Sequence, residues 1–265
     1  MAAPERERRR PHRGIFLLPN LFTTGGLFAG FYAIIAAMQG QFIDAAIAVF
    51  VAGILDGLDG RIARMTGTQS EFGVQYDSLA DLVSFGMAPA LVMYAWSLSL
   101  LRDLGPTWGK VGWAAAFLYA ACAALRLARF NTQVGVIDKR YFQGLASPAA
   151  AGLMMAFVWT LADSQYSGAD LAPMALALTV IVALLMVSRI RYYSFKSLPL
   201  GDRVPFIWIP LLVGIFVLLA IDPPRVLLTI GVAYVLSGPV MTLWGLRRWR
   251  ERRDPATRGE GGGPS

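Results

Sequence analysis

Long apolar runs alternate with short polar connections along most of this chain. A membrane-spanning helix needs about 20 mainly apolar residues, and the chain has about eight runs of that kind. They cover residues 20–38, 42–63, 78–101, 109–128, 147–163, 170–189, 206–221 and 226–246. The runs are continuously apolar and do not alternate with polar residues, which favours helices over a β-barrel. The pattern predicts an all-α, polytopic membrane protein with about eight transmembrane helices.

The ends of the chain differ in composition from its centre. We expect a basic cytoplasmic arm over residues 1–14, a transmembrane domain over 15–250 and a disordered, glycine-rich tail over 251–265. With 56% hydrophobic residues in 265 positions, the short connections leave no room for a separate soluble domain.

Local signals add detail within the domain. Ser147 and Pro148 predict a capped start for the fifth helix. Gly86 and Pro89 would permit a kink in the third helix.

The basic residues predict the topology. With the N-terminus in the cytoplasm, 21 of the 24 Lys and Arg residues fall in inner segments, as the positive-inside rule requires. The bias predicts that both termini are cytoplasmic. It also explains the net charge of +7 through topology and headgroup attraction, so we expect no nucleic-acid partner. The single cysteine, Cys122, excludes an intrachain disulfide and a cysteine zinc cluster.

Four aspartates lie where an apolar chain tolerates charge least. Asp56 and Asp59 are three residues apart, and Asp77 and Asp81 are four apart, so each pair shares one face of a helix. Charges at membrane depth are costly and usually functional. One nearby arginine, Arg64, cannot neutralise four carboxylates. Oxygen ligands suit hard cations, and four negative charges match two divalent ions, Mg²⁺ or Mn²⁺ with Ca²⁺ also possible.

The residues between the aspartates are typical of a phosphate site. Gly60 and Ala63 are small enough to let a bulky ligand approach the helix, and Arg64 offers a planar fork for phosphate oxygens. Gly73 would let the connection bend close to the site. A buried charge network and a cation-transport site are the alternatives. The position of the acids toward one face of the membrane, with Arg64 beside them, argues against transport.

The pattern D-x-x-D-G-x-x-A-R-x8-G-x-x-x-D-x-x-x-D resembles the signature of the CDP-alcohol phosphatidyltransferases, and the chain has every fixed residue between Asp56 and Asp81. The resemblance implies that Asp56, Asp59 and Asp77 bind metal and that Asp81 both binds metal and acts as general base. The residues that it places beside the nucleotide or its diphosphate are Asn20, Thr23, Gly60, Ala63, Arg64, Ser70 and Gly73.

A wider resemblance, over about residues 15–200, is to the bacterial integral-membrane branch of this family that uses serine. It rests on motifs such as Arg126-Leu127-Ala128-Arg129-Phe130-Asn131 and Arg191-Tyr192-Tyr193-Ser194-Phe195-Lys196. It implies CDP-diacylglycerol and L-serine as substrates, and a homodimer in the bacterial inner membrane whose site faces the cytoplasm. The same chemistry with glycerol phosphate, inositol phosphate or choline is the alternative. Candidates for binding the acceptor or lipid phosphate are Arg126, Arg129, Arg191 and Lys196.

Overall fold

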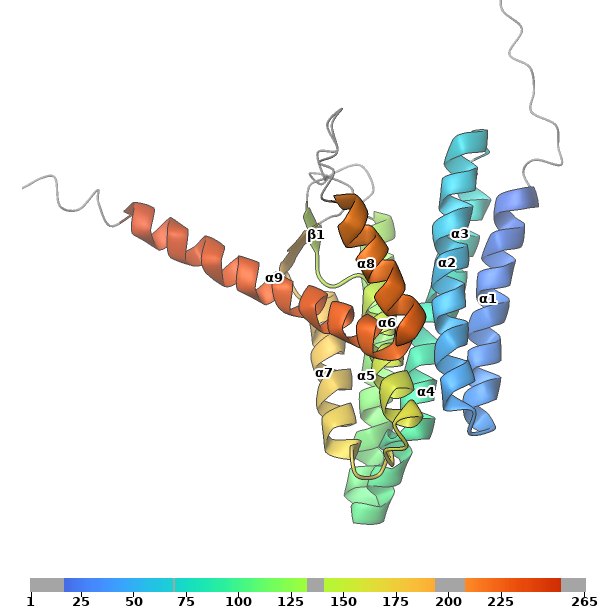
Figure 1. Ribbon diagram of the computed structural model, residues 1–265, viewed down its shortest axis with the longest axis vertical. Coiled ribbons are helices and arrows are strands. Elements are labelled where there is room, and N and C mark those ends of the chain that lie inside the picture. Colours follow the sequence, from blue (N-terminus) through green and yellow to red (C-terminus); the bar gives the residue numbers. More distant parts are fainter. Residues whose placement is uncertain (1–16, 69, 133–140, 194–207, 254–265) are drawn as a thin grey trace, which may run out of the picture.

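The computed structural model describes residues 17–68, 70–132, 141–193 and 208–253, so the predicted basic arm lies outside the described residues. Helices make up most of the described chain (Figure 1). Those of the first half are α1 (Leu17–Met38), α2 (Phe42–Thr66), α3 (Glu71–Asp81), the π-helical segment η2 (Leu82–Met87), α4 (Ala88–Trp96), the 3₁₀ helix η3 (Leu98–Leu104) and α5 (Pro106–Thr132). The second half contains α6 (Ser147–Asp163), α7 (Ala172–Val187), α8 (Trp208–Ile221) and α9 (Pro223–Arg253).

Every predicted apolar run coincides with a helix or, for the third run, with consecutive helical segments. Figure 1 shows α1 to α7 running along the long axis of the molecule, whereas α9 crosses it obliquely. Among the described residues, the helices long and apolar enough to cross a membrane are Leu18–Met38, Glu71–Leu104, Pro106–Thr132 and Pro223–Thr242. The molecule is therefore a helical membrane protein, while the count of eight spans and the side of the termini stay predictions.

Two features of the fold differ from the predicted all-α chain. Residues Tyr141–Gln143 (β1) and Arg191–Tyr193 (β2) form a short antiparallel sheet in which Phe142 pairs with Tyr192. Strands of three residues are too short to leave a period in the sequence. The last three residues of α9, 251–253, also extend into the predicted tail, because this helix ends at Arg253.

Small residues dominate the contact between the first two helices. Buried alanines face each other across α1 and α2, and Gly26 brings the backbones close, its Cβ position lying 3.6 Å from the Ala52 carbonyl oxygen. In a membrane, helices associate through such close van der Waals packing because lipid tails provide little hydrophobic driving force. This contact holds α1 against the helix that carries Asp56 and Asp59.

The third span is a continuous helix from α3 to α4 that is widened in the middle by η2. Pro89 has no N–H to donate to the carbonyl of Phe85, four residues earlier. Tyr119 of α5 donates its hydroxyl to that carbonyl at 3.0 Å, so the buried oxygen keeps a partner. The predicted kink position is thus a π-helical segment, a feature that is frequent at functional sites.

The third span begins earlier than its apolar run. The helix starts at Glu71, because the Ser70 side chain caps it by accepting the Gly73 N–H at 3.0 Å. Hydropathy cannot detect such a polar first turn. Gly73 therefore lies inside the helix, and its predicted role in bending the connection is wrong.

Gly30 lets α1 lie directly against η2. A Cβ atom on Gly30 would lie 2.5 Å from Ser84 Oγ and 2.7 Å from Ser84 Cα, closer than real contacts allow. Ser84 is buried and donates to the Gly26 carbonyl at 3.0 Å, which fixes the two helices together. The short distance between α1 and η2 thus depends on the absence of a side chain at Gly30.

We predict that Gly30→Ala lowers the thermal unfolding temperature in detergent, since overpacking of this kind costs about 1–3 kcal/mol. The matched control is Gly214→Ala on α8, where a new Cβ would meet nothing within 4 Å. The control should unfold at or above the temperature of the unaltered protein. Equal unfolding temperatures for Gly30→Ala and the unaltered protein would contradict the close approach.

Candidate metal and nucleotide site

The four aspartates converge where α2 and α3 face each other. Carboxylate oxygens of Asp56, Asp59 and Asp77 all lie within 4.8 Å of one another. Asp81 joins them from the last residue of α3, within hydrogen-bonding reach of Asp56. All four line one small cavity of about 10 Å³, which is large enough for a small ion or a water molecule, and Asp59 and Asp77 also face a larger cavity. The spacing on two helices thus produces the predicted cluster.

This donor set fits a divalent cation. The cluster consists of oxygen ligands with up to four formal negative charges, which is the chemistry that hard cations prefer. Without a bound cation, carboxylates this close repel one another. The residues Asp56, Asp59, Asp77 and Asp81 are therefore suited to hold metal, although their geometry does not select one element.

Thr23 of α1 fixes one member of the cluster. Its hydroxyl donates to Asp59 Oδ2 at 2.7 Å, and both side chains are buried with 5% exposure. Thr24, the next residue, links α1 to α3 through the Tyr76 hydroxyl at 2.9 Å. Because α1 supplies both contacts, it orients an aspartate and closes the site from the side.

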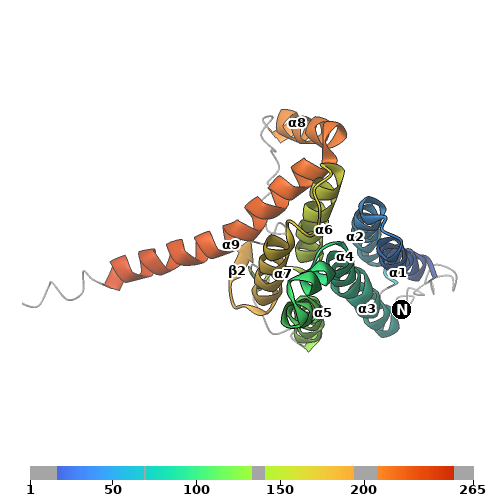
Figure 2. The ribbon, with the colours of Figure 1, turned by 90° about the horizontal axis from the view of Figure 1, so that it is seen from below.

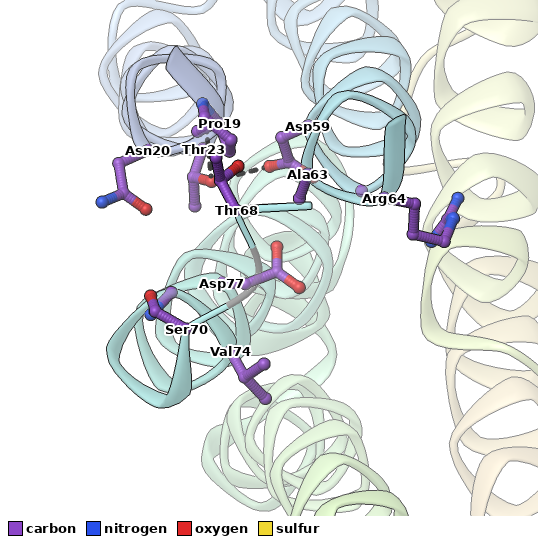
Figure 3. A pocket seen from close by; sticks show the side chains of 12 residues that line it. Pro19, Asn20, Thr23, Asp59, Ala63, Arg64, Thr68, Ser70, Val74 and Asp77 are labelled. Carbon is purple, nitrogen blue, oxygen red and sulfur yellow. Dashed lines mark hydrogen bonds between the residues drawn. The ribbon is translucent and has the colours of Figure 1, made fainter. Parts of the chain in front are cut away.

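A larger cavity, of about 260 Å³, adjoins the carboxylate cluster and shares Thr23, Asp59 and Asp77 with it. Figure 3 shows Asp59 and Asp77 extending from opposite walls of this cavity. All seven residues predicted beside the nucleotide line it, namely Asn20, Thr23, Gly60, Ala63, Arg64, Ser70 and Gly73. The structure thus brings together an open cavity, small side chains and an arginine next to the carboxylate cluster.

Two glycines open this cavity in different ways. The guanidinium of Arg64 lies over Gly60, where a Cβ atom would be 3.4 Å from Nη1. A Cβ on Gly73 would lie 3.1 Å from Ser70 Oγ and 3.5 Å from Asn20 Oδ1. A side chain on Gly73 would therefore crowd the Ser70 hydroxyl that caps α3.

Arg126 of α5 is a second basic neighbour of the carboxylates, which the charge count from sequence missed. Its guanidinium is close enough to Asp81 for electrostatic attraction, so Arg64 is not the one arginine near the carboxylates. Nη1 donates to Ser147 Oγ at 3.0 Å, while Nε is buried and has no hydrogen-bond partner in the described part of the chain. The predicted cap at Ser147 is wrong. Ala146 occupies the N-cap position of α6, and no side chain forms a capping hydrogen bond there. A buried guanidinium edge lacking a partner is suited to an anionic ligand.

The other acceptor candidates are placed less fully. Arg129 lies in the last turn of α5, one turn beyond Arg126. Arg191 belongs to β2, but its side chain is outside the described part. Lys196 lies outside the described residues altogether.

Further residues of the site carry no clear signal in the sequence. Thr68 is buried just beyond the end of α2 and lines the larger cavity together with Pro19 and Val74. Ser84 lines the carboxylate cavity from η2. Thr68 and Ser84 are ordinary polar residues in the sequence, so no pattern distinguishes them.

Known proteins resemble this chain in sequence. The sequence model of the family described as CDP-alcohol phosphatidyltransferase matches residues 16–194, more than half of the chain. A CDP-diacylglycerol–serine O-phosphatidyltransferase of Helicobacter pylori is 37% identical over 241 residues, which cover 90% of this chain and 93% of the relative. One of Mycobacterium tuberculosis is 42% identical over 154 residues, 55% of this chain and 51% of the relative. An archaetidylserine synthase of Methanothermobacter thermautotrophicus is 33% identical over 177 residues, 66% and 69% of the two chains.

We predict that Mn²⁺ or Mg²⁺ raises the unfolding temperature by about 5–10 °C at a concentration of about one hundred times the dissociation constant. Asp77→Asn should remove most of this rise, since it takes away one ligand and one charge. It should not lower the unfolding temperature in chelator, because mutual repulsion also falls. Asp163→Asn, an exposed aspartate at the end of α6, is the control and should keep the full rise. A full rise in Asp77→Asn would contradict metal binding at the cluster.

Proposed function

The chain belongs to the CDP-alcohol phosphatidyltransferase family, and from this premise we propose that it transfers the phosphatidyl group of CDP-diacylglycerol to the hydroxyl of L-serine. The products are phosphatidylserine and CMP. The observation that carries the proposal is the cavity lined by Gly60 and Arg64, which shares Asp59 and Asp77 with the carboxylate cluster. A nucleotide diphosphate fits such a site because its phosphates can reach both an arginine and bound cations.

The two cavities suggest separate binding sites for the nucleotide and for metal ions. Asn20, Thr23 and Ser70 line the larger cavity and would hold the CDP moiety, with Gly60, Ala63 and Gly73 leaving room for it. Two divalent ions, Mg²⁺ or Mn²⁺, held by the four aspartates would offset charge on the diphosphate and on departing CMP. The chain's own residues position the phosphates and accept the proton.

Asp81 is the proposed general base. It lines the small cavity and not the nucleotide-side cavity, so it lies on the side of the cluster away from the nucleotide. The serine oxygen forms a bond to the phosphatidyl phosphorus, and the bond from that phosphorus to the bridging oxygen of CMP breaks. The hydroxyl proton passes to Asp81, and the electron pair leaves with CMP. Asp81 thus raises the nucleophilicity of an alcohol that is weak at neutral pH.

Arg126 is the best supported site for the serine carboxylate. Its guanidinium neighbours Asp81 and presents a buried Nε without a partner among the described residues. An arginine fork can bind a carboxylate through two parallel hydrogen bonds. Arg129, one turn further along α5, is the second candidate. Arg191 and Lys196 follow from the family resemblance alone.

The protein is a membrane enzyme, and we propose that its active site faces the cytoplasm of a bacterial inner membrane. In Figure 1 the start of α1, the end of α2 and β1 lie at one end of the molecule. Arg64 and Arg129 lie in the last turns of α2 and α5, and basic residues close to the ends of spans favour a cytoplasmic side. A homodimer is proposed on the family resemblance alone.

The proposed activity is tested with purified protein in mixed micelles of detergent and CDP-diacylglycerol. Radiolabelled L-serine should appear in lipid, with equal release of CMP, only when Mg²⁺ or Mn²⁺ is present. Release of CMP with glycerol phosphate, inositol phosphate or choline, and not with serine, would show that the acceptor is that alcohol and not serine. If no alcohol causes release of CMP, the proposed transferase activity is contradicted and the alternative of cation transport is favoured.

We predict that Asp81→Asn lowers turnover by about 10²- to 10⁴-fold, the usual contribution of a general base. Asp170→Asn, an exposed residue before α7, is the control and should retain activity. Unfolding temperatures should establish that both variants are folded. Turnover of Asp81→Asn within about threefold of the unaltered protein would refute the role of base.

A further inference from the structure

The C-terminal helix α9 lies against the part of the bundle that holds Arg126. It packs on α6 and on β2, and Figure 2 shows it passing beside both. The family model ends at residue 194, so α9 lies beyond the part of the chain that it matches. The alignment with the Helicobacter pylori relative covers 90% of the chain and therefore reaches into α9.

Tyr192 of β2 anchors α9. Its side chain is fully buried, and its hydroxyl donates to the Val235 carbonyl of α9 at 3.3 Å. Its ring occupies the space that a side chain at residue 238 would fill, so Gly238 is required for the contact. Burial raises the pKa of Tyr192 to about 12, with a smaller contribution from Tyr234, so the hydroxyl is a neutral donor. The sheet and the helix are thus locked together.

Tyr234 of α9 lies between Tyr192 and the guanidinium of Arg126 in this chain of contacts. Its ring packs against that of Tyr192 with centroids 5.7 Å apart and planes inclined by 37°. It also lies within electrostatic range of the Arg126 guanidinium, as do Asp81 and Tyr119. Ser147 of α6 holds Nη1 of the same guanidinium at 3.0 Å. Arg126 of α5 is therefore surrounded by groups from α3, α6 and α9.

We propose that α9 forms one wall of the acceptor site, with Tyr234 as a positioning residue that aims Arg126 at the carboxylate of the acceptor. The inference rests on the proposed function and extends it, because it assigns acceptor selectivity to a helix beyond the matched family region. A long arginine side chain loses much rotamer freedom when it is held in place. Ser147 accepts a hydrogen bond from one nitrogen, and Tyr234 lies within electrostatic range of the guanidinium, while the Nε edge has no hydrogen-bond partner among the described residues.

A purely structural α9 predicts something different. If the helix only stabilised the fold, removal of one hydroxyl would leave both Michaelis constants unchanged. Damage to its packing would then lower the unfolding temperature and impair both substrates together. Selective weakening of the serine interaction distinguishes the two roles.

The test is steady-state kinetics of the full-length protein, with serine and CDP-diacylglycerol varied in turn. Tyr234→Phe keeps the ring contact with Tyr192 and should raise KM for serine about tenfold, the effect of a lost contact to a charged group. KM for CDP-diacylglycerol and the unfolding temperature should change little. Arg126→Lys should show a larger change in the same constant. Tyr166→Phe, an exposed tyrosine between α6 and α7, is the matched control.

Gly238→Ala gives a second, independent variant. Its methyl group would displace the Tyr192 ring and with it Tyr234, so KM for serine should again rise while Gly214→Ala shows no change. An unchanged KM for serine in Tyr234→Phe, with an active parent, would overturn the inference and leave the proposed function intact. Equal increases in both Michaelis constants would show that α9 only stabilises the fold, and would also overturn the inference. An inactive parent would overturn both proposals.

Discussion

Repulsion among four carboxylates at the end of a membrane helix bundle is the constraint on which the rest of the structure depends. Asp56, Asp59 and Asp77 hold oxygen atoms within 4.8 Å of one another, and Asp81 adjoins them. The free energy of such a cluster is unfavourable at low dielectric unless cations or hydrogen bonds compensate it. The fold responds with two rigid helices that fix the acids, a hydroxyl from Thr23, and the guanidinium of Arg126. The negative charge that these groups leave uncompensated would favour the binding of a divalent cation.

Close helix packing makes this arrangement possible. Gly30 and Ser84 bring α1 against the π-helical turn, and Tyr119 satisfies the carbonyl that Pro89 leaves without its usual donor. Side chains at these contacts are small or hydrogen-bonded, because a membrane offers no water to repair a poor fit. The nucleotide-side cavity is thus a consequence of how α1, α2 and α3 meet. The carboxylates determine its chemistry.

Hydropathy and spacing predicted the helices and the aspartate cluster because both depend on local periodicity. The start of α3 was placed too late because Ser70 caps a polar first turn, and the strands β1 and β2 are too short to predict. Arg126 was named only as one of several acceptor candidates. It lies 45 positions after Asp81 in the sequence, and no pattern shows which way a long side chain points. Contacts between distant helices therefore had to come from the structure.

The most direct test of the account is to locate metal in the protein. Crystals grown with Mn²⁺ and CDP would be measured at a wavelength where manganese scatters anomalously. We expect anomalous density enclosed by Asp56, Asp59, Asp77 and Asp81, with the nucleotide in the adjoining cavity beside Arg64. Nucleotide bound elsewhere, or a cluster without manganese at saturating concentration, would contradict it.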